Sequence, residues 1–145
     1  MVTTVDTSEV ASHLRITIAR TARRLRQEAG GELTAAQTAA LATVERHGPL
    51  TPSELAELER VQRPSATRII ARLAEAGLVE RAADPSDGRV SLVSITRAGV
   101  AELKRLRTRK NAYLARRLRE LDPADVAALE RAAEVLESIL EGERR

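Results

Sequence analysis

One short stretch of this chain concentrates side chains that can bond phosphates and the edges of nucleic-acid bases. Arginine binds guanine or phosphate through paired hydrogen bonds, and hydroxyl and amide groups bind phosphates or several bases. The candidates for such contacts in a major groove are Gln62, Arg63, Pro64, Ser65, Thr67, Arg68 and Arg72. Apolar residues recur among them at helical spacing, which predicts a helix with one face in a core and the polar face free to meet nucleic acid.

A second group of candidates follows in a turn. The run Asp84-Pro85-Ser86-Asp87-Gly88 holds residue types that close hairpins, and the surrounding residues 78–96 read as two short strands. Arg89, directly after this run, can enter a minor groove, where the potential is most negative in narrow stretches. Asp87 can orient that guanidinium through a charge-assisted bond, and Gly88 lies between the two. Taken alone, the same pair would be a surface salt bridge of little energetic value.

Caps and breaks predict the helices that position both groups. Thr34 and Gln37 form a capping-box pattern, and we expect their helix to end at a left-handed Gly48 before Pro49. A second capping box at residues 51–54 opens a short helix that ends at Glu59.

A break at residues 60–62 then leads to a helix over 63–76, which Gly77 stops. Two short helices joined by a tight turn and followed by a hairpin form a winged helix-turn-helix. In that arrangement the second helix enters a major groove and the wing reaches a minor groove. We therefore expect a mainly α-helical fold, with a winged helix-turn-helix DNA-binding lobe over 33–96 and a small β-hairpin as its wing.

The flanking helices segregate their charges. The predicted helix over 8–30 and the one over 97–120 are basic, whereas the last helix, which begins at Asp122-Pro123, is acidic. Basic and acidic helices with apolar stripes are typical of helices that pack against each other within or between chains. We expect residues 1–145 to form one unit in which 8–30 and 97–142 are dimerisation helices. The alternative is that these charged side chains only keep exposed helix faces solvated and contact no other helix.

Composition excludes several classes of function. The absence of cysteine rules out disulfides, thiolate metal sites and thiol-based sensing. The two histidines, His13 and His47, lie in different predicted helices, so we expect no metal site, no cofactor and no enzymatic activity. With no apolar run of ~20 residues and no signal-peptide pattern, we expect a cytoplasmic protein without a membrane partner. The net charge of +3 is weak evidence for nucleic acid by itself.

Three segments of the chain resemble the MarR family of bacterial transcriptional regulators. They are Leu-Ala-Glu-Ala-Gly-Leu-Val-Glu-Arg over 73–81, Asp-Pro-Ser-Asp-Gly-Arg over 84–89 and Ser-Ile-Thr-Arg-Ala-Gly over 94–99. The wing pattern Asp-x-x-Asp-x-Arg is among the more specific marks of that family. The resemblance implies a homodimeric repressor, or sometimes an activator, in which interlocking terminal helices form the dimer and both lobes read a palindromic operator in double-stranded DNA.

The same resemblance implies roles for individual residues. Arg89 would enter the minor groove with support from Asp87, and Ser65, Thr67 and Arg68 would face the major groove. Members of the family often release DNA when a small anionic or phenolic ligand binds between the dimer helices and the DNA-binding lobe. This chain has no Phe or Trp to stack on a phenol, and its one Tyr is Tyr113, so the effector stays unidentified and a ligand-free repressor is equally allowed.

Two other function classes stay open from the sequence. A non-specific architectural DNA-binding protein would share the basic faces but show no sequence preference and a dominant salt dependence. A winged-helix protein–protein interaction module would use its outer helices to bind a different partner. The polar face at residues 62–72 and the arginine after the turn count against the second class.

Overall fold

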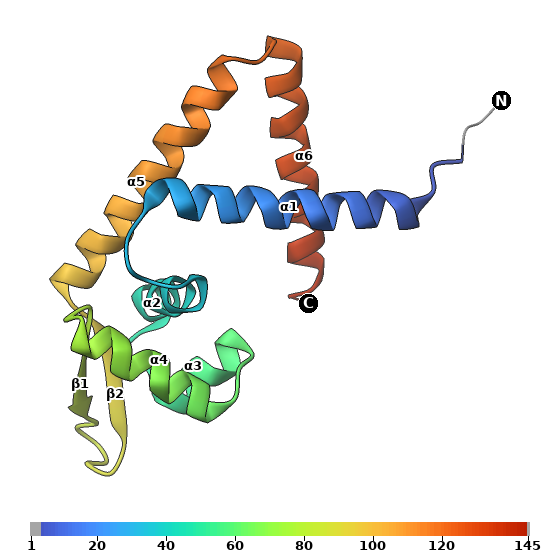
Figure 1. Cartoon of the computed structure of the whole chain (residues 1–145). Helices are drawn as coiled ribbons and strands as arrows, with labels where there is room; N and C mark the ends of the chain where they lie inside the picture. Colours follow the sequence, from blue (N-terminus) through green and yellow to red (C-terminus); the bar gives the residue numbers. More distant parts are fainter. Residues whose placement is uncertain (1–3, 145) are drawn as a thin grey trace.

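The computed structural model describes residues 4–144, and its elements follow one another as the sequence predicts. The elements are α1 (Thr7–Ala29), α2 (Ala35–His47), α3 (Pro52–Glu59), α4 (Arg63–Glu75), β1 (Val79–Ala83), β2 (Ser91–Ile95), α5 (Arg97–Arg119) and α6 (Pro123–Gly142). Figure 1 shows a lobe built from α2, α3, α4 and the β1–β2 hairpin, called the winged lobe below, and three long outer helices, α1, α5 and α6. The expected mainly α-helical winged helix-turn-helix fold is confirmed.

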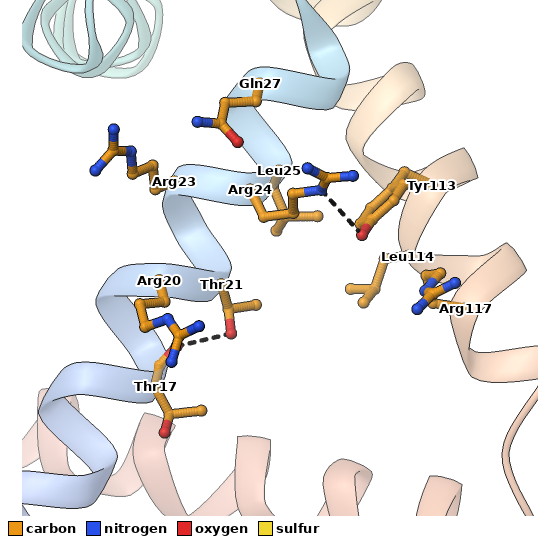
Figure 2. Close-up of a pocket in the computed structure, with 10 residues that line it drawn as sticks. All are labelled: Thr17, Arg20, Thr21, Arg23, Arg24, Leu25, Gln27, Tyr113, Leu114 and Arg117. Carbon is orange, nitrogen blue, oxygen red and sulfur yellow. Dashed lines mark hydrogen bonds between the residues drawn. The ribbon is translucent and has the colours of Figure 1, made fainter.

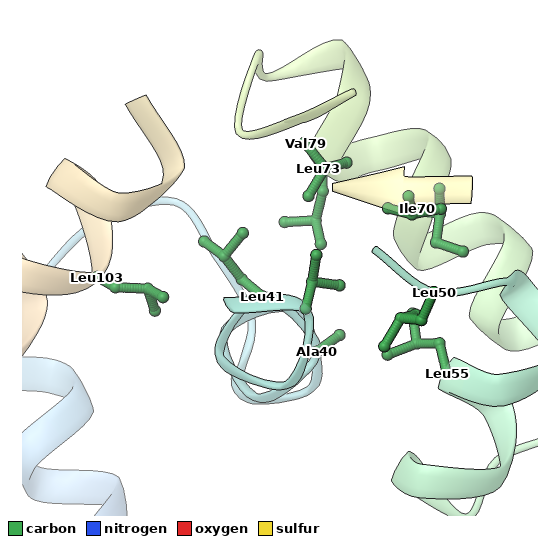
Figure 3. Close-up of a cluster of buried hydrophobic side chains, with 10 residues drawn as sticks. Ala40, Leu41, Leu50, Leu55, Ile70, Leu73, Val79 and Leu103 are labelled. Carbon is green, nitrogen blue, oxygen red and sulfur yellow. The ribbon is translucent and has the colours of Figure 1, made fainter. Parts of the chain in front are cut away.

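An aliphatic core centred on α2 holds the winged lobe together (Figure 3). Ala40 and Leu41 of α2 are fully buried, and Leu103 of α5 joins the same cluster. The other buried members of this cluster are Val44, Leu50, Leu55, Ile70, Leu73, Val79 and Val93. Because α4 and both strands contribute to one core, burial of these side chains fixes the wing relative to α4.

Three threonines begin helices as the sequence indicates. Thr34 and Gln37 form the complete capping box, with reciprocal bonds of 3.1 and 3.0 Å. The hydroxyl of Thr51 accepts a hydrogen bond from the Glu54 backbone N–H at 3.1 Å, and that of Thr96 accepts one from Gly99. Asp122 occupies the cap position of α6, but its side chain makes no capping bond.

The expectation of a left-handed Gly48 is wrong. Gly48 has φ −71° and ψ 161°, which is extended backbone, and its N–H donates to the Val44 carbonyl oxygen at 2.9 Å. Glycine is needed there for close approach, because a Cβ atom would lie 2.5 Å from that same oxygen. The left-handed conformation occurs instead at Arg60, the residue that ends α3 and turns the chain into α4.

The wing is an antiparallel hairpin with one additional bridge. Val79 pairs with Ile95 at its base and Ala83 pairs with Ser91 next to the tip. Val93 also exchanges two backbone hydrogen bonds with Leu50, at 3.1 and 2.8 Å, across a bridge that the sequence analysis did not predict. The bridge attaches β2 to the segment between α2 and α3, so the wing is anchored to the helix-turn-helix from two sides.

The outer helices extend well beyond the winged lobe. The end of α1 meets α5, where Ala29 and Leu106 are buried and the Arg109 guanidinium donates to the Ala29 carbonyl oxygen at 3.3 Å. From the far end of α5 the chain turns back as α6, and α6 has no buried residue. Among the described residues, no helix has the length and apolar character that crossing a membrane requires.

Candidate nucleic-acid interface

The α4 helix presents the predicted polar face outward because its other face is locked into the core. Ala66, Ile70 and Leu73 are at most 1% exposed, and Ile69 is partly buried against the same cluster. The predicted contact residues lie on the remaining surface: Ser65 is half-buried, and Gln62, Arg63, Pro64, Thr67, Arg68 and Arg72 are exposed. The structure therefore leaves all seven candidates on the part of α4 and its N-terminus that the core does not cover.

Two of the α4 arginines are held by neighbours on the same helix. An Arg68 Nη2 group donates to the Ser65 hydroxyl at 3.3 Å, and Arg72 Nη1 lies 3.4 Å from a Glu75 carboxylate oxygen. Both contacts are long and exposed, so they bias the side-chain directions without immobilising them. Arg63 has no carboxylate partner in the part of the chain that the structure describes, and its full charge faces solvent.

Gln62 occupies the N-cap position of α4 but makes no capping bond with its side chain. Its amide is exposed beside Arg63, with both donor and acceptor groups free for an external partner.

At the wing tip, backbone and carboxylate bonds close a tight turn. The Asp84 carboxylate accepts a bond from the Ser86 N–H at 2.8 Å, and the Asp84 N–H donates to the Val90 carbonyl at the same distance. The bonds from Ser86 hold the pKa of Asp84 below its ordinary value, because they stabilise the ionised carboxylate. Asp84 thus caps the turn as the sequence indicates.

Asp87 and Arg89 are paired as predicted. One Asp87 carboxylate oxygen accepts bonds from the Arg89 backbone N–H at 3.1 Å and from its guanidinium Nε at 3.3 Å. The Arg89 side chain is nevertheless 93% exposed, so the pair directs the guanidinium outward instead of burying it. At Gly88 a Cβ atom would meet nothing within 4 Å, so this position also faces open space.

Arg81 is a basic wing residue that sequence reasoning missed. It lies on β1 opposite Val93, is exposed, and lines a shallow hollow of about 280 Å³ together with Arg89 and Ser91. Two guanidinium groups and a hydroxyl around one concave surface have the chemistry of a phosphate contact. The sequence feature that could have identified Arg81 is a basic residue within the predicted first strand of the hairpin.

The two histidines lie on other elements than these groups. His13 is on α1 and His47 ends α2, and both are exposed. Within residues 4–144, no three His, Cys, Asp or Glu side chains lie close enough together to hold a metal ion.

The two basic groups of residues occur in the same lobe. Figure 1 shows α4 and the hairpin side by side at the end of the molecule remote from the α5–α6 connection. An exposed helix face with hydroxyl, amide and guanidinium groups thus lies beside a hairpin whose tip projects an arginine. Such an arrangement can contact adjacent grooves of a duplex.

Comparisons with known proteins agree with this geometry. Residues 33–91 match the sequence profile of the MarR family. An HTH-type transcriptional regulator of Mycobacterium bovis is 38% identical over 78 residues, which make up 54% of this chain and 54% of the relative. The chain therefore matches about half the length of the curated relatives.

Solved structures extend the similarity over nearly the whole chain. A candidate transcriptional regulator from Pseudomonas aeruginosa PA01 is 31% identical, with a TM-score of 0.85 over 94% of this chain and 97% of that one. Wild-type MarR from E. coli in its apo form is 25% identical, with a TM-score of 0.68 over 92% of this chain and 98% of that one. The outer helices are therefore part of the shared fold.

Proposed function

Since the chain belongs to the MarR family, whose members are transcriptional regulators and not enzymes, we propose that it binds double-stranded DNA site-specifically as a homodimer and regulates transcription. The observation that carries this proposal is the pairing of two exposed basic groups in one rigid lobe. The polar face of α4 and the Arg89 guanidinium both project from a shared core, so neither has to be reorganised before binding.

In the proposed complex, α4 lies in the major groove. The candidates for base and phosphate contacts there are Gln62, Arg63, Pro64, Ser65, Thr67, Arg68 and Arg72, and Pro64 also lies in the first turn of the helix. The wing follows the adjacent minor groove, with Arg89 inserted and Asp87 and Gly88 shaping the tip. Arg81 would contact the flanking phosphates.

The exposed surface supports a homodimer. A compact protein of 15.8 kDa exposes about 7,300 Å², whereas this chain exposes 11032 Å². Large apolar side chains are exposed on the outer helices, among them Val10, Leu14, Leu129 and Leu140. A second copy that covered these helices would bury this surface, and residues 8–30 and 97–142 would then be the dimerisation helices.

A two-fold dimer has a consequence for the operator. Two copies of α4 would be spaced about one helical turn apart, ~34–36 Å, so the expected site is a pseudo-palindrome. We propose repression as the sign of regulation, because a dimer on such a site excludes other proteins from the same duplex. The proposal includes release of the protein from DNA by a small ligand, as the family resemblance implies. It names no chemical class for that ligand.

Selection from a random duplex library tests the proposal. Wild type and Arg89→Ala would be run in parallel at physiological salt, and the enriched sequences compared. Enrichment of an inverted repeat with half-sites about one turn apart, weakened by the substitution, supports a dimeric sequence-specific regulator.

Two other results would contradict the proposal. Equal retention of every duplex by both proteins, with a steep salt dependence, indicates an architectural DNA-binding protein. Absence of DNA binding indicates a protein–protein module. Transcription from the selected operator with and without the protein then gives the sign of regulation.

A further inference from the structure

The left-handed turn between α3 and α4 has an arginine where such a helix end usually has glycine. The Val61 N–H donates to the Ala56 carbonyl oxygen at 3.0 Å, and the Arg60 N–H donates to the Glu57 carbonyl oxygen at 3.2 Å. This pair of bonds is the Schellman motif, with which many helices end. Arg60 has φ 53° and ψ 45° and is the only non-glycine residue with positive φ among residues 4–144. In that conformation a Cβ atom crowds the following carbonyl oxygen, which glycine avoids.

The end of α4 provides an internal comparison, because it has the same turn with glycine. The Gly77 N–H donates to the Ala74 carbonyl oxygen at 3.0 Å, and the Leu78 N–H donates to the Leu73 carbonyl oxygen at 2.9 Å. Gly77 has φ 75°, and a Cβ atom added there would meet nothing within 4 Å. The same chain therefore closes one such turn with glycine and the other with Arg60, although the backbone of both turns would accept glycine.

The Arg60 side chain makes no contact that would explain its presence in the turn. It is exposed, and within the described part of the chain no hydrogen bond or ion pair joins its guanidinium to another residue. The neighbouring Glu59 carboxylate accepts a hydrogen bond from the Thr43 hydroxyl of α2 instead. The Arg60 guanidinium therefore directs its full charge to solvent, and the turn gains nothing from the side chain that glycine would lack.

An arginine that holds this fold together has partners within the chain, as a groove of about 600 Å³ between α1 and α5 shows (Figure 2). In this groove Arg24 lies 2.9 Å from the Glu28 carboxylate and donates to the Tyr113 hydroxyl at 3.4 Å. Its guanidinium also lies 5.8 Å from the centre of the Tyr113 ring, so this one arginine links α1 to α5. Among the described residues, Arg60 has no contact of these kinds.

The Arg60 turn lies where the proposed complex brings the chain against DNA. In a helix-turn-helix, the first helix crosses the DNA backbone and the N-terminal residues of the second helix contact base edges. The turn between the two helices therefore passes along the edge of the major groove, where the phosphates lie. Arg60 is two residues before Gln62, the N-cap residue of α4, and Figure 1 shows α3 and α4 as neighbours in the winged lobe. A guanidinium at this edge can bind a phosphate through paired hydrogen bonds.

We propose that Arg60 binds a backbone phosphate of the operator, and that the left-handed strain at this position is retained for that contact. This inference rests on the proposed DNA binding and adds a residue that lies outside the exposed face of α4 and outside the wing. Glycine would relieve the strain but has no side chain with which to bind phosphate. Stability and DNA affinity should therefore change in opposite directions when glycine replaces Arg60.

Three substitutions at position 60 separate the strain from the charge. Arg60→Gly removes both, so the melting temperature should rise by about 2–4 °C. Its affinity for the selected duplex should fall roughly tenfold, because a dimer loses two phosphate contacts. Arg60→Gln keeps the strain and removes the charge, so it should bind as weakly as the glycine variant and melt like wild type. Arg60→Lys keeps both strain and charge and should bind more tightly than Arg60→Gln. Calorimetry and fluorescence anisotropy measure the two properties.

The salt dependence of binding identifies the contact as one to phosphate. Loss of one phosphate contact per copy should reduce the slope of log affinity against log salt by about one, hence by about two for a dimer. The fold-loss in Arg60→Gln should be the same on the selected duplex and on a scrambled one, because phosphates carry no sequence information. A loss confined to the selected duplex would make Arg60 a base contact and overturn the phosphate assignment.

Gly77→Ala is the matched control for the strain. It places a Cβ atom in the equivalent turn of α4 and removes no charge, so the melting temperature should fall by about as much as it rises in Arg60→Gly. Its affinity for the selected duplex should remain that of wild type. An unchanged melting temperature in both variants would show that a side chain in this turn causes no strain, and would overturn that part of the proposal.

The outcomes distinguish this inference from the proposed function. If wild type selects a duplex and both Arg60→Gly and Arg60→Gln bind it equally well, the Arg60 assignment is overturned and the regulator stands. A lower melting temperature for Arg60→Gln would give the side chain a structural role and would also overturn the assignment. A wild type that binds no duplex overturns both the assignment and the proposed function.

Discussion

The Thr96 hydroxyl donates a hydrogen bond of 2.7 Å to the Gly77 carbonyl oxygen and accepts one of 3.1 Å from the Gly99 N–H. The Thr96 N–H also donates to the Leu78 carbonyl oxygen at 3.0 Å. One residue thus joins the turn after α4, the base of the wing and the start of α5. It is a direct link between the winged lobe and the outer helices.

We predict that Thr96→Val lowers the free energy of unfolding by about 1–2 kcal/mol, because it removes the helix cap and leaves the Gly77 carbonyl without this donor. Chemical denaturation measures the change. Thr96→Ser keeps the hydroxyl and should stay close to wild type. Equal loss in both variants would show that the methyl group matters and the hydrogen bonds do not.

Two glycines have no room for a side chain. At Gly99 a Cβ atom would clash with the Leu78 carbonyl oxygen and lie 2.6 Å from Ile95 Cγ1, and at Gly48 it would lie 2.5 Å from the Val44 carbonyl oxygen. Gly99→Ala and Gly48→Ala should each destabilise the protein by at least about 1–3 kcal/mol. Gly88→Ala is the control and should leave the melting temperature unchanged, since nothing lies within 4 Å of that position.

Arg89→Ala should weaken operator binding by about tenfold or more without changing the melting temperature. The side chain is 93% exposed and Asp87 is its one ion-pair partner among the described residues, so folding does not depend on it. Asp87→Asn should give a smaller loss, because the guanidinium remains but is less well directed. Fluorescence anisotropy with the selected duplex measures both variants, and a large fall in melting temperature for Arg89→Ala would contradict the wing assignment.

In the proposed complex Glu75 would compete with DNA for Arg72, to which it is paired at 3.4 Å. We predict that Glu75→Gln strengthens DNA binding about twofold to fivefold at low salt, because it frees a cation and removes a charge that repels phosphate. The gain should shrink as salt is raised. Arg72→Gln should weaken binding and reduce the salt slope by about one if Arg72 contacts a phosphate. An unchanged affinity in both variants would place Arg72 outside the interface.

The Asp84 turn should be insensitive to pH over the physiological range. The pKa of Asp84 lies below its ordinary value of 3.8, so the ionised carboxylate stabilises the folded wing above that pH, and the contribution is lost as pH falls through the lowered pKa. An NMR titration should show the Asp84 carboxyl and the Ser86 amide changing together, with a midpoint below 3.8. A midpoint at or above that value would mean that the turn bonds do not stabilise the carboxylate.

Much of the candidate interface could be predicted from the sequence, because its determinants are local. A threonine cap acts within three residues, helical spacing acts within one or two turns, and the Asp84–Arg89 turn contains its own hydrogen bonds. Arg81 was missed for a related reason. A lone cation on a short strand is only a weak local signal, and the fold of the hairpin is what brings Arg81 to one hollow with Arg89.

The order of the helices, the helix-turn-helix, the wing and the family all follow from the amino-acid sequence, since caps, turn residues and apolar spacing act between near neighbours. The extended Gly48, the Leu50–Val93 bridge, the groove between α1 and α5 and an α6 without buried residues emerge only once the chain is folded. These features depend on contacts between segments far apart in the chain. A helix face is buried only if another element packs on it. The sequence of that face does not show which element this is.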